Sequence, residues 1–413
     1  MFWWGCQLRK YHSGEGSLKK VMLKLMSGNA LGQLLIFFVT PILSRLYGPD
    51  DFANLALLVT FSSLFSIVAG LRFDFVYLRE KCNRASYLTV SLVFCSLSAI
   101  CVFFVSALFK SVEWAAYLFL LSLSSGYMNI VGQFVVADKF YSGFAFAKGL
   151  QYLCQALVAV LFGLLMVKEG LVWAMMISQF IFVFILRKTL SFNLSKSVYG
   201  DVRGDLFFCV KNSIGTILQY STPMAPVLLL GALSSKESVG MYFFVAQLLS
   251  APLNIFRRSF AYYLNTEFSS REKVPDFKKS FFTRKFTLLV LAAIIVVLIA
   301  SVGVYVWGEF LFLLAFGEGW GGAGEVAWLL LMYFVFDSLV QPFSGLLSLW
   351  GRERLHLFIE IFRWFIVFFG IYMVSVFYNI SSMFSILLMY CVVMLFFGFL
   401  ILILLKREAY EKG

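Results

Sequence analysis

The sequence predicts an all-α polytopic membrane protein with about twelve transmembrane helices in two halves of six helices each. Three observations support this prediction. Of the 413 residues, 61% are hydrophobic and only 14% are charged, whereas soluble domains contain about 25% charged residues. Hydrophobic stretches of about eighteen or more residues recur along the whole chain, and each could cross a bilayer as a helix. Finally, the second half of the sequence repeats features of the first.

The expected helices lie near residues 25–47, 53–78, 86–109, 113–137, 144–167, 170–189, 207–231, 239–264, 285–307, 325–349, 353–378 and 382–405. The connections are mostly short, and the longest, at 191–205 and 265–285, cannot hold a catalytic domain. The expected organisation is an N-terminal tail at 1–24, an N-lobe at 25–190, a linker at 191–206, a C-lobe at 207–405 and a C-terminal tail at 406–413.

Basic residues predict the orientation of the helices. They gather in alternate connections, and only Arg45, Lys110, Lys168 and Lys236 fall on the opposite side. Lys and Arg accumulate in the cytoplasmic loops of membrane proteins, so both termini are expected in the cytoplasm. The same rule explains the net charge of +12, and we therefore expect no nucleic-acid partner.

Cysteine and histidine usage argues against a disulfide framework, a metal site and histidine-based catalysis. Seven cysteines are scattered through the chain without a C-x-x-C pair, and the only histidines are His12 and His356. We expect neither a metal nor an organic cofactor.

The two halves share a short motif and a proline. "NALG" at Asn29–Gly32 returns as "NSIG" at Asn212–Gly215, and Pro41 corresponds to Pro226. Because each repeat has an even number of helices, both halves enter the membrane from the same side. Such halves are related by an axis along the membrane normal.

Three stretches of the sequence resemble a known family. They are "SGNALGQLLIFFVTPILSRLYGPDDF", "SSKESVGMYFFVAQLLSAPLNIF" and "FGEGWGGAGEVAWLLLMYFVFDSLVQPFSGLLSLWGRERL". Their order and spacing resemble the bacterial polysaccharide flippases of O-antigen and capsule repeat units, in the multidrug/oligosaccharidyl-lipid/polysaccharide exporter (MOP) superfamily. The resemblance covers roughly residues 25–405. The chain departs from the family at Ala53, where a glycine is usual, and at Asp74, where the acidic residue is often Glu.

The resemblance implies the fold of multidrug-and-toxin-extrusion (MATE) transporters, in which two six-helix lobes surround a central cavity that opens alternately to the two sides of the membrane. It implies a bacterial inner-membrane protein that moves undecaprenyl-pyrophosphate-linked oligosaccharide from the cytoplasmic to the periplasmic leaflet. Coupling to a Na⁺ or H⁺ gradient is open. The implied partners are membrane lipids, a polysaccharide polymerase and a chain-length regulator.

Three other functions remain open. A MATE-type drug or cation antiporter would favour acidic cavity residues, whereas most of the candidate charged residues within the spans here are cationic. A membrane polysaccharide polymerase or glycosyltransferase would need a large outer loop or clustered outer carboxylates. A lipid II flippase usually has fourteen spans.

Ionisable residues within membrane spans are costly and therefore mark candidate sites. The candidate contacts for pyrophosphate or glycan are Arg72, Arg257, Arg258, Arg363, Arg45 and Lys148. Arg is suited to bidentate phosphate contact, although each of these side chains could instead extend to the lipid headgroups. Arg45 could also lock an outer gate against Asp50 or Asp51.

The candidate acidic residues are Asp337, Glu360 and Asp74. Glu360 and Arg363 have the i, i+3 spacing of a helical ion pair, and Asp337 is an alternative partner for Arg363. Such a pair is either structural or an ion-coupling group.

Prolines and polar side chains within the spans are the remaining candidates. Pro41, Pro223 and Pro226 are expected to interrupt corresponding helices, which points to moving or binding segments. Polar residues that could line a sugar path are Asn29, Gln33, Asn129, Gln133, Gln219, Gln247 and Gln341.

The stretch "FGEGWGGAGE" at 316–325 matches the G-x-G-x-x-G nucleotide-binding pattern. That pattern requires a preceding strand and a βαβ unit, which a hydrophobic-helix sequence does not supply. We expect a tight turn at the membrane interface, with Trp320 in the aromatic belt.

Overall fold

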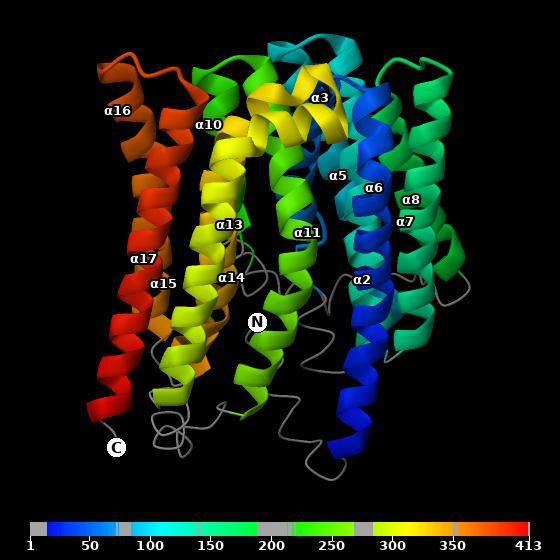
Figure 1. Cartoon of the computed structure of the whole chain (residues 1–413). Helices are drawn as coiled ribbons and strands as arrows, with labels where there is room; N and C mark the ends of the chain where they lie inside the picture. Colours follow the sequence, from blue (N-terminus) through cyan, green and yellow to red (C-terminus); the bar gives the residue numbers. More distant parts are fainter. Residues whose placement is uncertain are drawn as a thin grey trace. The chain divides into compact units, whose positions relative to one another are not determined.

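The computed structural model describes residues 15–71, 73, 84–138, 140–187, 213, 217–218, 220–267, 284–349 and 353–411. These residues contain helices and no strand (Figure 1), which confirms the predicted all-α class. Eight of the described helices are long and apolar enough to cross a membrane, and three shorter apolar helices accompany them at Ala30–Leu46, Gly170–Leu186 and Thr222–Leu233. Helix α11 (Lys236–Glu267) covers the remaining expected range, 239–264.

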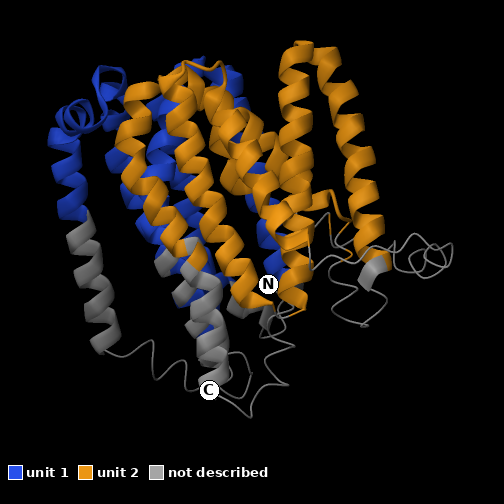
Figure 2. Cartoon of the chain, turned by 90° about the vertical axis from the view of Figure 1, so that its right-hand side faces the viewer, with its two compact units in different colours: residues 1–15, 229–413 blue, residues 16–228 orange. Residues whose placement is uncertain are grey.

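The chain forms two compact units, coloured in Figure 2, of which unit 2 comprises residues 16–228. Its helices are α2 (Glu15–Leu46), α3 (Pro49–Val68), α5 (Arg84–Phe109), α6 (Val112–Ala137), α7 (Tyr141–Leu164) and α8 (Gly170–Leu186). Helix α6 packs against α3, α5, α7 and α8. Its small residues Ala115, Ser122, Ser124 and Gly126 are buried, which lets neighbouring helices approach closely.

Unit 1 comprises residues 229–413 together with 1–15. After α10 (Ala225–Leu233) and α11 it contains α13 (Arg284–Phe316), α14 (Gly321–Leu349), α15 (Glu353–Phe365), the π-helical segment η6 (Ile366–Gly370), α16 (Ile371–Phe377) and α17 (Met383–Glu411). Helix α14 packs against α11, α13 and α17. The boundary between the units falls within α10, and the predicted linker 191–206 lies outside the described residues, so the lobe boundaries stay a prediction.

The prediction of a single helix over 53–78 is wrong at its end. Helix α3 stops at Val68, and Leu71 takes a left-handed conformation with φ of 45°. A non-glycine residue in this region is uncommon and ends a helix. The backbone N–H of Leu71 donates to the carbonyl of Val68 at 2.7 Å, which tightens the end of the helix into a turn.

The expected interruption at Pro41 is also wrong, because α2 continues through this residue. Two hydroxyl side chains near Pro41 bond to carbonyls of the same helix. Thr40 donates to the carbonyl of Ile36 at 2.7 Å, and Ser44 donates to the carbonyl of Pro41 at 3.0 Å. A change of helix type does occur at Pro223, which lies in the 3₁₀ segment η3 (Thr222–Met224), whereas Pro226 lies in the first turn of α10.

The glycine-rich stretch forms the expected turn, but the placement of Trp320 in the aromatic belt is wrong. Gly317 has φ of 101°, which glycine adopts without steric cost, and the 3₁₀ segment η5 (Glu318–Trp320) leads into α14. The Trp320 side chain is 1% exposed and stacks on Phe244 with ring centroids 4.0 Å apart. Stacking in the core of unit 1 outweighs the preference of indole for the interface.

Gly324→Ala is expected to lower the free energy of unfolding by about 1–3 kcal/mol through overpacking. A Cβ at this position would lie 2.5 Å from the carbonyl carbon of Gly308, where α14 meets α13. Gly303→Ala on α13 is the control, because a Cβ there meets no atom within 4 Å. The thermal unfolding midpoint of the purified protein measures both changes, and equal midpoints would argue against close contact at Gly324.

Candidate functional site

The first part of the site joins α11 to α14. Arg257 Nη1 lies 3.3 Å from Asp337 Oδ2, and Arg257 Nη2 donates to Asn254 Oδ1 at 2.6 Å. The two charged side chains are 31% and 21% exposed. One guanidinium therefore binds a carboxylate and an amide at once, which holds its planar group in a defined orientation.

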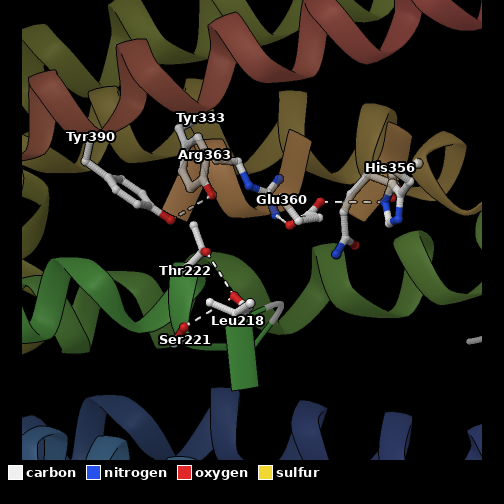
Figure 3. Close-up of polar contacts among 10 residues, drawn as sticks. Leu218, Ser221, Thr222, Tyr333, His356, Glu360, Arg363 and Tyr390 are labelled. Carbon is white, nitrogen blue, oxygen red and sulfur yellow. Dashed lines mark hydrogen bonds and ion pairs between the residues drawn. The ribbon is translucent and has the colours of Figure 1, made fainter. Parts of the chain in front are cut away.

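The second part lies on α15, where Glu360 is shared by two side chains (Figure 3). Arg363 Nη2 donates to Glu360 Oε2, and His356 Nε2 lies 3.6 Å from Glu360 Oε1. The spacings of three and four residues place all three side chains on one face of the helix. The Glu360 side chain is only 7% exposed, so Arg363 and His356 replace water as the partners of its carboxylate.

The two parts form one electrostatic group within unit 1. The carboxylate of Asp337 is within electrostatic reach of Arg363 and Glu360 as well as Arg257. We call this group the arginine–carboxylate cluster and define it by its six residues, Asn254, Arg257, Asp337, His356, Glu360 and Arg363. Its two arginines balance its two carboxylates when His356 is neutral.

Two features distinguish Arg363 within the cluster. Its Nε is buried and has no hydrogen-bond partner among the described residues, so one donor remains for a ligand. The π-helical segment η6 begins three residues later, at Ile366. Single π-helical turns inside α-helices are frequent at functional sites.

Two tyrosines of unit 1 meet beside the cluster. The hydroxyls of Tyr333 on α14 and Tyr390 on α17 lie 3.2 Å apart (Figure 3). Both rings are buried, being 5% and 1% exposed, and Tyr333 lies one helical turn before Asp337. They tie α17 to α14 at the level of the cluster.

The remaining candidates are dispersed over the described residues. Lys148 on α7 in unit 2 donates to Gln151 Oε1 at 3.0 Å and lies 4.8 Å from the ring centroid of Phe182. Arg45 is exposed at the end of α2. It forms no ion pair with Asp50 or Asp51, and Asp51 instead accepts from the backbone N–H of Gly48 at 3.0 Å, so the expected gate pair is not formed.

Some candidates lie where the structure gives no side-chain description. Arg72 and Asp74 fall outside the described residues, and Arg258 lies on α11 without a described side chain. His356 and Asn254 belong to the cluster but were not predicted as site residues from the sequence. Their spacings from Glu360 and Arg257, four and three residues, were the available signal.

Comparisons with known proteins place the fold. No protein-family model matches the sequence, and no curated protein matches it. Among solved structures, the chain is similar to a multidrug resistance MATE family transporter of the MOP superfamily in an inward-facing conformation, with a TM-score of 0.63, 12% identity and coverage of 96% of this chain and 99% of that chain.

Two further solved structures of MATE proteins are similar to this chain. The eukaryotic MATE transporter AtDTX14 matches with a TM-score of 0.59, 14% identity and coverage of 95% and 98% of the two chains. A MATE protein in complex with MaL6 matches with a TM-score of 0.54, 13% identity and coverage of 95% and 97%. The protein therefore has the MATE transporter fold over nearly its whole length.

Proposed function

We propose that the protein is a membrane transporter that works by alternating access, and that the arginine–carboxylate cluster binds its substrate or coupling ion. One observation carries the proposal. Two ion pairs, Arg257–Asp337 and Glu360–Arg363, lie within hydrophobic helices of a MATE-type fold. Charges inside membrane spans are expensive and usually functional.

The donor of Arg363 that has no described partner, and not the net charge of the cluster, favours an anionic substrate. Each carboxylate is neutralised by an arginine, and the buried Nε of Arg363 retains a free donor. A diphosphate oxygen could accept from that donor and replace a carboxylate on the guanidinium. With the resemblance in sequence, this supports a flippase for undecaprenyl-pyrophosphate-linked oligosaccharide in the bacterial inner membrane, with Arg45, Arg72, Arg258 and Lys148 as further contacts.

The comparisons lend more support to a second candidate, a MATE-type antiporter for drugs or organic cations. The solved structures of similar fold include a multidrug resistance transporter. In this case Asp337 or Glu360 would bind the cationic substrate after its arginine had moved away. The flippase family itself rests on the sequence resemblance alone.

The coupling ion is part of either proposal. Asp337 and Glu360 are carboxylates in low-dielectric surroundings that could take up Na⁺ or H⁺ when an arginine leaves them. A flippase would also act beside a polysaccharide polymerase and a chain-length regulator.

Deletion of the gene separates the two candidates. A flippase mutant is expected to lose surface polysaccharide and to accumulate lipid-linked oligosaccharide, with unchanged sensitivity to ethidium. An antiporter mutant is expected to gain ethidium sensitivity and keep its polysaccharide. Complementation with the wild-type gene is the control, and a strain with neither phenotype would contradict both candidates.

A further inference from the structure

His356 gives the arginine–carboxylate cluster a side chain whose charge changes near neutral pH. Its Nε2 lies 3.6 Å from Glu360 Oε1, while Arg363 Nη2 donates to the other carboxylate oxygen. His356 and Arg363 lie on either side of Glu360 in Figure 3. Histidine is the side chain that ordinarily gains or loses its charge between pH 5 and 8. One carboxylate is therefore shared between a permanent cation and a conditional one.

The net charge of the cluster depends on the state of His356. When the imidazole is neutral, two guanidinium groups balance two carboxylates. An anionic guest then adds unbalanced negative charge to a largely buried group, which is costly. When the imidazole is protonated, the cluster carries one excess positive charge, and this charge balances part of the charge of the guest.

The described ionisable groups around His356 come from four helices. On α15 itself, Glu360 and Arg363 are within electrostatic reach of the imidazole. Helix α15 packs against α14, α17 and η6, and η6 has no ionisable residue. The ionisable groups of the other helices are Asp337 and Tyr333 on α14, Arg257 on α11, Tyr390 on α17 and the exposed Arg407 near the end of α17. Among all these groups, the imidazole is the one that ordinarily titrates near neutral pH.

The three side chains follow a useful order along α15. His356 lies in the first turns of the helix and is 15% exposed, so its ring can exchange a proton with water. Glu360 comes next, one turn further. Arg363 follows, and its buried Nε has no hydrogen-bond partner among the described residues. The proton site and the donor for an anion are therefore separate groups, connected through one carboxylate.

We propose that His356 is a positioning residue for an anionic substrate, and that its protonation makes Arg363 available to the diphosphate. The proposal rests on the proposed function in its flippase form and deepens it. The protonated ring donates to Glu360 Oε1, so the carboxylate no longer balances Arg363 alone. The diphosphate accepts from Arg363 Nε and balances the excess charge. When His356 loses its proton, the Glu360–Arg363 pair is again neutral and the anion is held less tightly.

Sulfate binding to the purified protein in detergent tests the proposal. Sulfate keeps both negative charges from pH 5.5 to pH 8, so any effect of pH on its binding comes from the protein. Because binding and protonation at linked sites strengthen each other equally, the dissociation constant, measured by calorimetry, is expected to rise about tenfold over this range.

Two replacements of His356 separate its charge from its shape. His356→Gln is neutral at every pH and should bind sulfate at pH 5.5 about as weakly as the wild type does at pH 8. His356→Lys keeps a cation four residues before Glu360 and should bind at pH 8 about as tightly as the wild type does at pH 5.5. A purely structural role would weaken binding in both variants and leave the dependence on pH in place.

Two further variants locate the effect. Lys168→Ala, which removes an exposed ion pair of unit 2, should keep the wild-type pH profile, and Arg363→Ala should abolish binding. If a replacement of His356 fails to fold, His356→Asn or His356→Arg takes its place. The proposal would be overturned by wild-type binding that is absent at pH 5.5 or does not change with pH, or by a pH profile that survives in His356→Gln.

Transport in proteoliposomes distinguishes this proposal from the proposed function. In undecaprenyl-pyrophosphate-linked oligosaccharide both phosphates are esterified, so the compound also keeps its charge from pH 5.5 to pH 8. If the wild type moves none of it while sulfate binding follows the expected profile, the flippase function fails and the role of His356 in anion binding stands. If the wild type moves it with the same half-saturating concentration at both pH values, as His356→Gln does, the role of His356 fails and the function stands.

Discussion

Glu360→Ala is expected to lower the free energy of unfolding by about 3–5 kcal/mol, the cost of leaving one member of a buried ion pair alone. The substitution removes the carboxylate that accepts from Arg363, whose side chain is only 13% exposed. It also takes away the anion beside His356. Thermal or denaturant unfolding in detergent measures the loss, and transport should fall with it.

A double-mutant cycle separates the pair from general damage to α15. Glu360→Leu combined with Arg363→Met replaces both charges by apolar side chains, and this variant should recover much of the lost stability because no charge is left buried. Transport should remain absent, since the ligand-binding donor of Arg363 is gone. Strictly additive losses of stability would show that the pair contributes no coupling.

Arg257→Ala is expected to reduce transport at least about tenfold, with a smaller loss of stability of about 1–3 kcal/mol for the unpaired Asp337. Arg257 connects Asn254 on its own helix with Asp337 on α14. Arg257→Lys should restore little activity, because an ammonium cannot reproduce the planar two-sided contact of a guanidinium.

An exposed ion pair of the same protein supplies the matched control for Arg257. Lys168 Nζ lies 2.7 Å from Glu113 Oε1, with the side chains 72% and 56% exposed. Exposed pairs contribute little because water screens them, so Lys168→Ala should leave both transport and unfolding unchanged. An Arg257→Ala protein as active as Lys168→Ala would remove Arg257 from the site.

Hydropathy was sufficient to predict the helical class, because the bilayer requires each span to satisfy its own backbone hydrogen bonds. It could not predict the ends of helices. The run of apolar residues continues past Val68, yet α3 ends there with a left-handed Leu71. Pro41 shows the opposite case, since α2 accommodates a proline that the sequence suggested would interrupt it.

The candidate site likewise contains one ion pair that the sequence could predict and one that it could not. Glu360 and Arg363 are three residues apart, so helical periodicity alone brings them together, and the structure forms this pair. Arg257 and Asp337 lie on different helices, and only the packing of α11 on α14 makes them neighbours. Trp320 was misplaced for the same reason, because its partner Phe244 is distant in sequence.

Transport in proteoliposomes tests the central claim, that the arginine–carboxylate cluster serves the substrate of a transporter, most directly. Vesicles containing the purified protein are loaded separately with undecaprenyl-pyrophosphate-linked oligosaccharide and with ethidium, and movement across the bilayer is followed for wild type, Arg363→Ala and Lys168→Ala. We predict that the wild type and Lys168→Ala move the lipid-linked oligosaccharide and that Arg363→Ala does not. Movement of neither compound by the wild type, or full activity of Arg363→Ala, would contradict the claim.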